Sequence, residues 1–416
     1  MPTTPPTSPV PRDLGPPDVV GARRRTLVLA VPDYLPALGG TTTQARLHAI
    51  ELANRGWEVT VVTRRVPASP PHERIDGVEV RRMGPPSRGN LAKAIVLARL
   101  WWWLAVRRRR IDALSILMDA DYALCAWAAG LARVSVFTWV TAGDATRSLA
   151  GAKGRLRRRA LRPSAQVVLT EAMATELAAL GLPNAATIAV PVDPKRFGPP
   201  TPNERAAART TLGLGSEPVI VSIGHLQPRK GTDRLLLALG RLRDRGTVAT
   251  LVLVGGPVEA ADRLYVGELE RLVHAAGLHG QVRFAGPQTD VRPYLAAADL
   301  FCLASHREGM PNVLLEAMAC GVPCVAPLSA GGDLLGGGAG VVPASNSPDD
   351  LAEAIGRLLG DPGQRDELRR VALDRVRQSH SIAQVVDAYE RLFAERRTAP
   401  VGRADPARLL RRQRGR

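Results

Sequence analysis

Apolar and polar positions follow two patterns along this chain, and each pattern predicts a different element. Short apolar runs rich in Val, Ile and Leu are typical of strands buried on both faces. In the first half they read RTLVLAVP, EVTVVTR, GVEVRRM, IDALSIL, VSVFTWV, QVVLT and TIAVPVD; in the second half they read VIVSIGH, TLVLVGG, VRFAG, LFCLAS, VPCVAP and GVVPA. Segments with helical spacing of apolar residues lie between them. This alternation predicts two parallel, doubly wound α/β sheets, one in each half of the chain.

A proline-rich break between Pro194 and Pro202 separates the two halves. We therefore predict a Rossmann-like N-terminal domain at residues 23–197 and a Rossmann-like C-terminal domain at residues 198–381. Ligands of such sheets bind beyond the carboxyl ends of the strands. The functional residues are accordingly sought in the loops that follow the predicted strands.

The ends of the chain differ in composition from the two domains. Residues 1–22 are rich in Pro and contain no apolar segment of signal-peptide length, which predicts disorder and a cytoplasmic protein. A helical pattern covers residues 382–396. Residues 397–416 form a basic tail that is expected to be loose.

The composition supports two large cores and adds a strong positive charge. The 416 residues are 45% hydrophobic, and 56 Lys and Arg against 39 Asp and Glu leave a formal net charge of +17. No nucleic-acid recognition motif accompanies this charge, so a nucleic-acid partner is not predicted. The four cysteines lie inside apolar runs without metal-ligand spacing, which predicts reduced core thiols and no metal site: Cys125, Cys302, Cys320 and Cys324.

The stretch SHREGMPNVLLEAMACGVPCVA, Ser305 to Ala326, carries the most specific chemical signal. Gly309 permits a tight turn after a buried strand. Pro311 suits the first position of a helix, where its missing N–H is not needed. The helix is predicted to run to about Ala319 and to be followed by another strand.

The first turn of this predicted helix is a candidate anion site. Around Asn312, Val313 and Leu314, unpaired backbone N–H groups and the positive end of the helix dipole are available. Glu316 lies four residues after Asn312 on the same helix face, so its carboxylate is directed toward whatever the helix start binds. A carboxylate accepts hydrogen bonds from hydroxyls such as those of a ribose, and Glu308 would meet a second set of hydroxyls. Ribose, diphosphate and sugar occur together in one kind of molecule, a nucleotide sugar.

The segment EGMPNVLLEAMACGVPCVA, with seven residues between its two glutamates, resembles the signature of the family 4 retaining glycosyltransferases of the two-Rossmann-domain (GT-B) type. VIVSIGHLQPRKGTDRLLLAL resembles the donor-phosphate strand and loop of that family. GGTTTQARLHAIELANRGWEVTVVTR resembles its N-terminal glycine loop and first helix, and IAVPVDPKRFGP its interdomain connection. Together these segments cover most of the chain from Arg25 to Arg396.

The resemblance implies two Rossmann-like domains that face each other across a cleft. Residues 23–197 would form the acceptor side, residues 198–381 would bind the nucleotide sugar, and the helix at 382–396 would cross back to the N-terminal domain. The donor-binding residues implied in the motif are Glu308, Gly309, Met310, Pro311, Asn312, Val313 and Glu316.

Lys230 is a further candidate for the donor phosphates, and with Glu308 it is the predicted catalytic pair. It follows a strand end and precedes Gly231, so a fixed ammonium there would offset the charge on a departing diphosphate. In the family this lysine commonly works with a second basic residue, usually Arg, just after the strand's glycine. Here that position is His225, and the second positive charge depends on protonation of this histidine or on Arg229.

Gly39 and Gly40 follow the first predicted strand, where a loop without side chains lets backbone N–H groups approach the diphosphate. A plain turn is the alternative interpretation. No G-x-G-x-x-G leads from a predicted strand into a helix, which argues against a dehydrogenase.

The acceptor side carries a weaker signal. Relatives often have a histidine near the end of the fourth or fifth strand of the first domain, but here these places read SILMDADY and FTWVTAGDATR. The polar or adaptable residues left there are Met118, Asp119, Asp121 and Asp144, of which Asp119 and Asp144 are the candidates for contacting donor sugar or acceptor. Each is also a plausible helix cap. His48 and His306 are predicted to lie on the surface.

The resemblance implies transfer of a hexose-type sugar from a UDP- or GDP-linked donor to a hydroxyl acceptor, with retention of anomeric configuration. The leaving phosphate would take the acceptor's proton, so no cofactor, metal or separate nucleophile is expected. Two alternatives remain open: a sugar-nucleotide 2-epimerase of the same architecture, and an inactive donor-binding regulatory subunit, suggested by His225 and the missing acceptor histidine.

The segment NLAKAIVLARLWWWLAVRRRR, Asn90 to Arg110, is apolar nearly all the way round. Its three consecutive tryptophans cannot all enter one core, and the segment is too short and too charged to span a bilayer. Tryptophans beside arginines suit the headgroup level of an anionic bilayer, and the basic run from Gly154 to Arg162 would add attraction. We predict peripheral binding to the inner membrane face and a lipid-linked acceptor. A helix buried between the sheet and a partner chain is the alternative.

Overall fold

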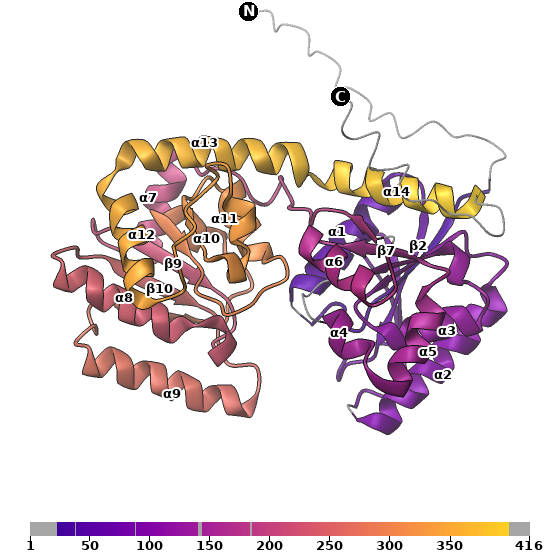
Figure 1. The fold of residues 1–416 in the computed structure, drawn as a ribbon. Coiled ribbons are helices and arrows are strands. Elements are labelled where there is room, and N and C mark those ends of the chain that lie inside the picture. The colour runs from indigo at the N-terminus through magenta and orange to yellow at the C-terminus, as the bar shows by residue number, and fades with distance from the viewer. Residues whose placement is uncertain (1–22, 38, 88, 140–143, 184, 399–416) are drawn as a thin grey trace, which may run out of the picture.

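The computed structural model describes residues 23–37, 39–87, 89–139, 144–183 and 185–398. They form two α/β domains joined by a connection near residue 197 and by a helix that crosses between them at the C-terminal end (Figure 1). The predicted disordered N-terminus, residues 1–22, lies outside the described residues, as does the part of the basic tail from residue 399 onward. The predicted α/β class with two Rossmann-like sheets is confirmed.

The N-terminal domain is built on an eight-stranded sheet with the order β3-β4-β2-β1-β5-β6-β7-β8. All neighbouring strands are parallel except β3, which pairs antiparallel with β4. The strands are β1 (Thr26–Ala30), β2 (Glu58–Arg64), β3 (His72–Ile75), β4 (Val78–Met83), β5 (Ala113–Leu117), β6 (Ser135–Thr138), β7 (Ala165–Val168) and β8 (Ala185–Thr187). The edge strand β3 was not predicted, because HERI lacks the apolar run of a buried strand.

Helices cover both faces of this sheet. Leu27 and Leu29 of β1 pack against one helical layer, whereas Val28 and Ala30 belong to the core under the other layer, which follows from the alternation of side chains along a strand. The helices are α1 (Gly40–Asn54), α2 (Asn90–Arg107), α3 (Ala120–Ala128), η1 (Ala132–Val134), α4 (Asp144–Ser148), α5 (Gly151–Leu161) and α6 (Glu171–Ala179). Helix α2 packs against α3, and α3 against α5.

The C-terminal domain has a five-stranded parallel sheet with the order β11-β10-β9-β12-β13. Its strands are β9 (Val219–Ile223), β10 (Thr250–Val254), β11 (Val282–Gly286), β12 (Leu300–Cys302) and β13 (Cys324–Val325). Its helices are α7 (Pro202–Thr211), η2 (Pro228–Lys230), α8 (Thr232–Asp244), α9 (Ala260–Ala275), α10 (Arg292–Ala297), α11 (Asn312–Ala319), η3 (Leu328–Ala330), η4 (Gly332–Leu335), α12 (Pro348–Gly360) and α13 (Pro362–Ser379). The strand predicted at GVVPA is reduced to a single bridge between Val325 and Val341.

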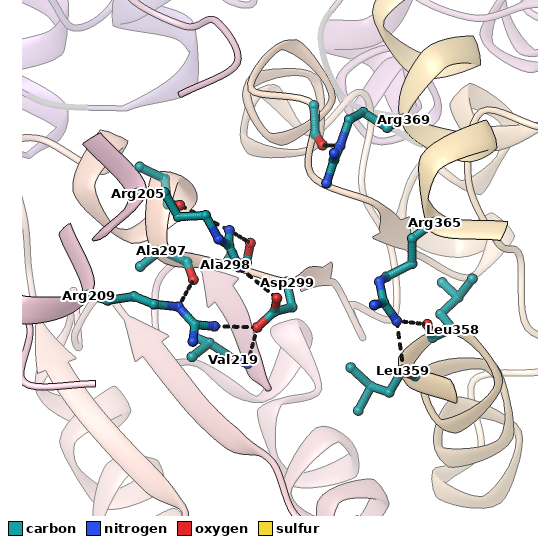
Figure 2. A network of polar contacts seen from close by, with 12 residues as sticks. Arg205, Arg209, Val219, Ala297, Ala298, Asp299, Leu358, Leu359, Arg365 and Arg369 are labelled. Atoms are coloured by element: carbon teal, nitrogen blue, oxygen red, sulfur yellow. Dashed lines mark hydrogen bonds and ion pairs between the residues drawn. The ribbon is translucent and has the colours of Figure 1, made fainter. Parts of the chain in front are cut away.

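Asp299 holds α7 to the sheet of this domain (Figure 2). Its carboxylate accepts hydrogen bonds from the Val219 N–H at 2.7 Å, from Arg205 at 2.6 Å and from Arg209 at 2.5 Å. On the other side, Arg369 of α13 donates to the carbonyl of Gly321 at 2.9 Å, just after the end of α11. The helix that carries Glu316 is therefore fixed at its C-terminal end.

Helix α14 (Ile382–Thr398) leaves the C-terminal domain and packs on the N-terminal domain (Figure 1). Tyr389 shares a hydrogen bond of 2.9 Å with Thr138 at the end of β6, and Trp57 donates to Glu390 at 2.7 Å. His48 of α1 lies under this helix, with its ring centroid 4.8 Å from that of Tyr389. The prediction that His48 is a surface residue is therefore wrong, because α14 covers the face of α1 on which it lies.

Candidate active site

Helix α11 begins beyond the carboxyl end of β12, where the motif predicted it. Pro311 is the N-cap, in extended conformation, and Asn312 is the first helical residue, so the proline lies one position earlier than predicted. One side of the helix is completely buried, through the side chains of Leu314, Leu315 and Met318. The first turn carries no acidic side chain and no side-chain cap. Its positive end is thus directed outward from the sheet, toward the N-terminal domain.

Glu308 lies in the loop before α11 and is engaged by two cations. Lys230 Nζ is 2.5 Å from Glu308 Oε1, and Arg229 Nη1 is 3.4 Å from Glu308 Oε2. The Glu308 N–H donates to the Ser329 carbonyl at 2.7 Å, which fixes the loop. Burial by itself raises the pKa of this carboxyl, but the neighbouring ammonium of Lys230 outweighs it and the pKa is lowered. Glu308 is therefore an ionised acceptor at neutral pH.

Lys230 is positioned by a tight turn between β9 and α8. It ends η2, and Gly231 follows with φ 62°, a left-handed conformation that favours glycine. A Cβ on Gly231 would lie 2.1 Å from the Ala304 carbonyl oxygen, so no other residue fits. The Lys230 side chain runs back over the end of β9, and a Cβ on Gly224 would lie 3.5 Å from its Cε. Two predicted residues 78 positions apart, Lys230 and Glu308, are thus brought together.

His225 adds little positive charge to this site. It follows Gly224 at the end of β9, and burial together with the nearby Lys230 ammonium lowers its pKa. It is neutral at pH 7, and Arg229 rather than His225 is the second cation near Lys230. The side chain of Arg229 is 45% exposed, which leaves it free to turn toward a ligand.

Glu316 faces a cleft between the domains, and its carboxyl group has no hydrogen-bond partner in the described part of the chain. The cleft has a volume of about 90 Å³ and is lined by α1, by the connection from Pro191 to Phe197 and by the exposed side of α11. Burial raises the pKa of Glu316 to about 7, and Arg196 is the one cation that opposes the shift. A buried carboxyl without donors is a site that a hydroxyl-bearing ligand can satisfy.

The predicted glycine loop meets α11 directly. Asn312 donates to the Gly40 carbonyl at 3.0 Å and accepts a hydrogen bond from Gln44 at 3.0 Å. Gly39 lines the same cleft as Glu316. A Cβ on Gly40 would lie 3.1 Å from the Asn312 amide nitrogen, so the Asn312 side chain would have to shift slightly.

Met310 of the motif lies at a second hollow between the domains. Met310 lines this hollow of about 430 Å³ together with Glu171 of the N-terminal domain, Asp333 and His380. Gly309 and Val313 lie on either side of the Pro311 cap. Glu316 and Met310 of the same motif thus line different interdomain spaces.

The residues predicted on the acceptor side lie in different surroundings. Asp119 caps α3 by accepting from the Asp121 N–H at 2.8 Å, and it pairs with Lys93 at 3.3 Å. Asp121 is buried and paired with Lys93, Lys153 and Arg157. Asp144 begins α4, and its side chain lies outside what the structure describes. Asp119 is thus placed at the carboxyl end of β5, but its carboxylate already has partners.

Met118 connects this region to the glycine loop. Its φ is 66°, an unusual value for a residue with a side chain, and its sulfur accepts a hydrogen bond from Thr41 at 3.0 Å. His306 is exposed, as predicted.

Asp193 and Arg196 line the cleft and were not predicted from the sequence, and neither was Gln44, which donates to Asn312. Arg196 donates to the Thr289 carbonyl at 3.2 Å and lies 3.6 Å from Asp290, so it joins the interdomain connection to the C-terminal domain. The only available signal was the position of Arg196 and Asp193 in the segment IAVPVDPKRFGP. Within the described ranges, no cluster of His, Cys, Asp and Glu could hold a metal ion.

Comparisons with known proteins agree with this geometry. Residues 217–361 match the family "Glycosyl transferases group 1", and residues 39–193 match the family "Glycosyl transferase 4-like domain". A GDP-mannose-dependent alpha-(1-6)-phosphatidylinositol monomannoside mannosyltransferase of Mycolicibacterium smegmatis is 37% identical over 182 residues, which are 41% of this chain and 46% of that protein. A D-inositol 3-phosphate glycosyltransferase of Nocardia farcinica is 36% identical over 41% of this chain and 39% of its own length. The chain thus spans less than half of the length of these curated relatives.

Solved structures extend the similarity to the whole fold. A sucrose-phosphate synthase from Thermosynechococcus elongatus superimposes with a TM-score of 0.73 at 22% identity, over 89% of this chain and 100% of that chain. Anabaena HepE in complex with UDP and glucose gives a TM-score of 0.73 at 20% identity, over 89% of this chain and 100% of that chain. The two family matches take in both domains, and the structural similarity takes in their arrangement. The chain belongs to the group 1 glycosyltransferases with a glycosyl transferase 4-like N-terminal domain, and its fold is GT-B.

Proposed function

We propose that this protein transfers a sugar from a nucleotide-diphosphate donor to a hydroxyl acceptor with retention of configuration. The observation that carries the proposal is the grouping of Lys230, Glu308 and the first turn of α11 next to Glu316, which has no hydrogen-bond partner among the described residues. A cation and a helix start suit a diphosphate, and a carboxyl without donors suits a ribose. The glycosyltransferase names of the two relatives support this reading.

Each group has a separate task in the proposed complex. The N–H groups at the start of α11 and the Lys230 ammonium bind the diphosphate, and Arg229 turns from Glu308 toward it. Glu316 accepts hydrogen bonds from the ribose hydroxyls. Gly39 and Gly40 approach the diphosphate from the opposite domain, where the lack of a side chain lets backbone N–H groups come close.

The chemical step is front-face substitution at the anomeric carbon. The bond from that carbon to the leaving phosphate oxygen breaks, the acceptor oxygen forms the new bond on the same face, and the leaving phosphate takes the acceptor proton. Lys230 offsets the charge that develops on the phosphate, and Glu308 accepts hydrogen bonds from the sugar and steadies positive charge on its ring. Closure of the two domains excludes water, which otherwise hydrolyses the donor.

The donor is a UDP- or GDP-sugar, and GDP-mannose is the first to test because the M. smegmatis relative depends on it. The acceptor is a lipid-linked hydroxyl compound, such as an inositol-containing lipid or a cell-envelope glycan precursor. The names of the two relatives, one acting on a phosphatidylinositol mannoside and one on an inositol phosphate, support this class. With such an acceptor, we propose that the reaction takes place at the inner face of the membrane.

A donor screen that measures release of the nucleoside diphosphate, with and without acceptor, tests the proposal. Release that requires acceptor is the expected result, with Lys230→Met as the inactive control. Release without any acceptor, with a changed sugar, would instead identify a 2-epimerase. Tight donor binding without turnover on any acceptor would identify the inactive regulatory subunit that the neutral His225 suggests.

A further inference from the structure

The large hydrophobic side chains exposed on the described part of the N-terminal domain all lie on three neighbouring helices. We call the set the tryptophan face: Leu91, Trp101, Trp102 and Val106 on α2, Trp127 on α3, and Leu156 on α5. Their exposed fractions run from 38% for Trp127 to 77% for Leu91. Helices α2, α3 and α5 pack beside one another on the same layer, at the lower right of Figure 1. A water-facing layer of helices would not concentrate apolar side chains in this way.

Helix α2 has apolar residues on both of its sides. Its buried stripe repeats every four residues and packs into the domain core: Ala92, Val96, Leu100 and Leu104. At 100° per residue, the opposite side also carries an apolar stripe: Leu91, Ala94, Ala98, Trp101, Trp102 and Val106. Trp101 and Trp102 lie with ring centroids 6.5 Å apart. The outward stripe contributes nothing to the core, so it needs another apolar environment.

Trp103 differs from its two neighbours. It is only partly exposed and packs on the core, with the Arg107 guanidinium 4.9 Å from its ring centroid. The triplet therefore divides between one tryptophan that holds α2 to the domain and two that face outward.

The exposed charge around the tryptophan face is mainly positive, because Asp121 of α3 is buried and paired with Lys93, Lys153 and Arg157. Neither α2 nor α5 contains an acidic residue, and α2 is followed by a run of arginines from Arg107 to Arg110. Arg155 and Arg159 on the outward side of α5 form no ion pair with any residue that the structure describes. No helix in the described part of the chain is long and apolar enough to cross a bilayer.

From this geometry we infer that the tryptophan face is a docking surface for an anionic lipid bilayer, with α2 lying in the plane of the headgroups. Tryptophan side chains favour the boundary between headgroups and acyl chains, and arginines beside them contact lipid phosphates. The positive charge selects an anionic surface over a neutral one. A second copy of this chain is disfavoured as occupant, because two such faces would bring the unpaired arginines of α5 together. The inference deepens the proposed function by naming the surface that brings the enzyme to its lipid-linked acceptor.

Vesicle binding tests this inference without any turnover. We expect the protein to co-sediment with vesicles of phosphatidylcholine and phosphatidylglycerol, to bind phosphatidylcholine vesicles weakly, and to be released by salt. Of the six tryptophans in the chain, Trp57 and Trp139 are buried, whereas Trp101, Trp102 and Trp127 are on the face. Binding should therefore also shift the tryptophan emission to shorter wavelength.

Two double variants remove the apolar and the electrostatic contribution to vesicle binding separately. Trp101→Ser with Trp102→Ser should lower vesicle binding by about tenfold or more, because the apolar contribution is lost. Arg155→Gln with Arg159→Gln should lower binding and also weaken its salt dependence. Leu264→Ser is the matched control, since Leu264 is 74% exposed on α9 of the other domain and its loss should leave binding unchanged.

Binding that ignores lipid charge and salt, or that survives both double variants, would overturn the inference. A dimer in solution that the Trp101→Ser, Trp102→Ser variant dissociates would show that a second copy, not a bilayer, covers the face. Vesicle binding that remains intact in a protein without turnover on any donor would count against the proposed activity alone.

Discussion

Glu316 and Glu308 belong to the same motif but lie in opposite electrostatic situations. Glu308 is paired with Lys230, whereas Glu316 faces the interdomain cleft without a donor from any described residue. Burial raises the pKa of Glu316, and the Lys230 cation lowers that of Glu308. The two carboxyl groups are therefore suited to different tasks. Glu316 is suited to a neutral hydroxyl partner, and Glu308 is suited to a site that contains charged groups.

Glu316→Ala should weaken donor binding by about 1.5 to 3 kcal/mol, because it removes the charge-assisted hydrogen bonds that we propose to form with the ribose. Titration calorimetry with the donor measures the effect. Glu268→Ala, on the exposed side of α9, serves as the control. An unchanged donor affinity in a folded Glu316→Ala protein would refute the ribose assignment.

Glu316→Gln should change how stability depends on pH. The carboxyl has an ordinary pKa of 4.5 and a pKa of about 7 in the folded protein, so the folded state holds the proton more tightly than the unfolded chain. Its stabilising contribution is complete below about pH 4.5 and is lost as the pH rises through 7. Urea unfolding of the unliganded protein should show a loss on the order of 2 kcal/mol across this window, relative to Glu316→Gln. Parallel profiles for the two proteins would contradict this.

Glu308→Gln should lower turnover more than donor affinity. The amide keeps the shape of the side chain but removes the negative charge that orients Lys230 and that we propose to steady the sugar. Steady-state kinetics and calorimetry on the same variant separate the two effects. A fall in affinity that matches the fall in kcat, or no fall in either, would exclude the assigned role.

At the scale of elements, the sequence predicted most strands and the helix of the motif, because buried parallel strands and helix starts have local signals. The edge strand β3 was missed because its residues are polar, and the strand predicted at GVVPA forms only one bridge. The contact of Lys230 with Glu308 depends on β9 and β12 being neighbours, which only the strand order reveals. Arg196, on the interdomain connection, lines the same cleft as Glu316 and opposes the rise of its pKa, and no local pattern indicates this proximity.

Asp299→Ala should destabilise the C-terminal domain by about 2 to 4 kcal/mol. The change leaves the Arg205 and Arg209 guanidiniums and the Val219 N–H without their shared acceptor, and α7 loses its attachment to the sheet. Chemical denaturation measures the loss. Asp349→Ala is the comparison, since this carboxylate is 61% exposed and also faces two arginines, Arg241 and Arg245. Equal losses in the free energy of unfolding for the two substitutions would show that burial of the Asp299 hydrogen bonds does not contribute to stability.

At the scale of the whole molecule, α14 makes the folding of the N-terminal domain depend on the end of the chain. His48 is buried under this helix, and its Nε2 has no partner within the described residues. Burial lowers its pKa from 6.5 to about 4. The packing of α14 on α1 therefore buries His48 in its neutral form, and protonation of His48 opposes this packing.

His48→Phe should make the protein more resistant to acid than the wild type. Because the folded-state pKa is depressed, the stabilising contribution of neutral His48 is complete above pH 6.5 and is lost as the pH falls toward 4. The wild type should lose about 3 kcal/mol across this window that the variant retains. Thermal unfolding between pH 4 and pH 7 measures the difference, with exposed His279→Gln as control. A wild type and a variant with the same acid profile would contradict the prediction.

The chain passes between the domains twice, and the two passages are joined. The Val192 N–H donates to the His380 carbonyl at 3.0 Å, and Val192 forms a parallel bridge with Ser381. Two covalent tethers that lie side by side leave rotation about a single axis and oppose twisting of one domain over the other. We therefore expect the cleft of this protein to open by a hinge motion about that axis. One distance across the cleft, such as that between labels on α9 and α4, should be sufficient to follow it.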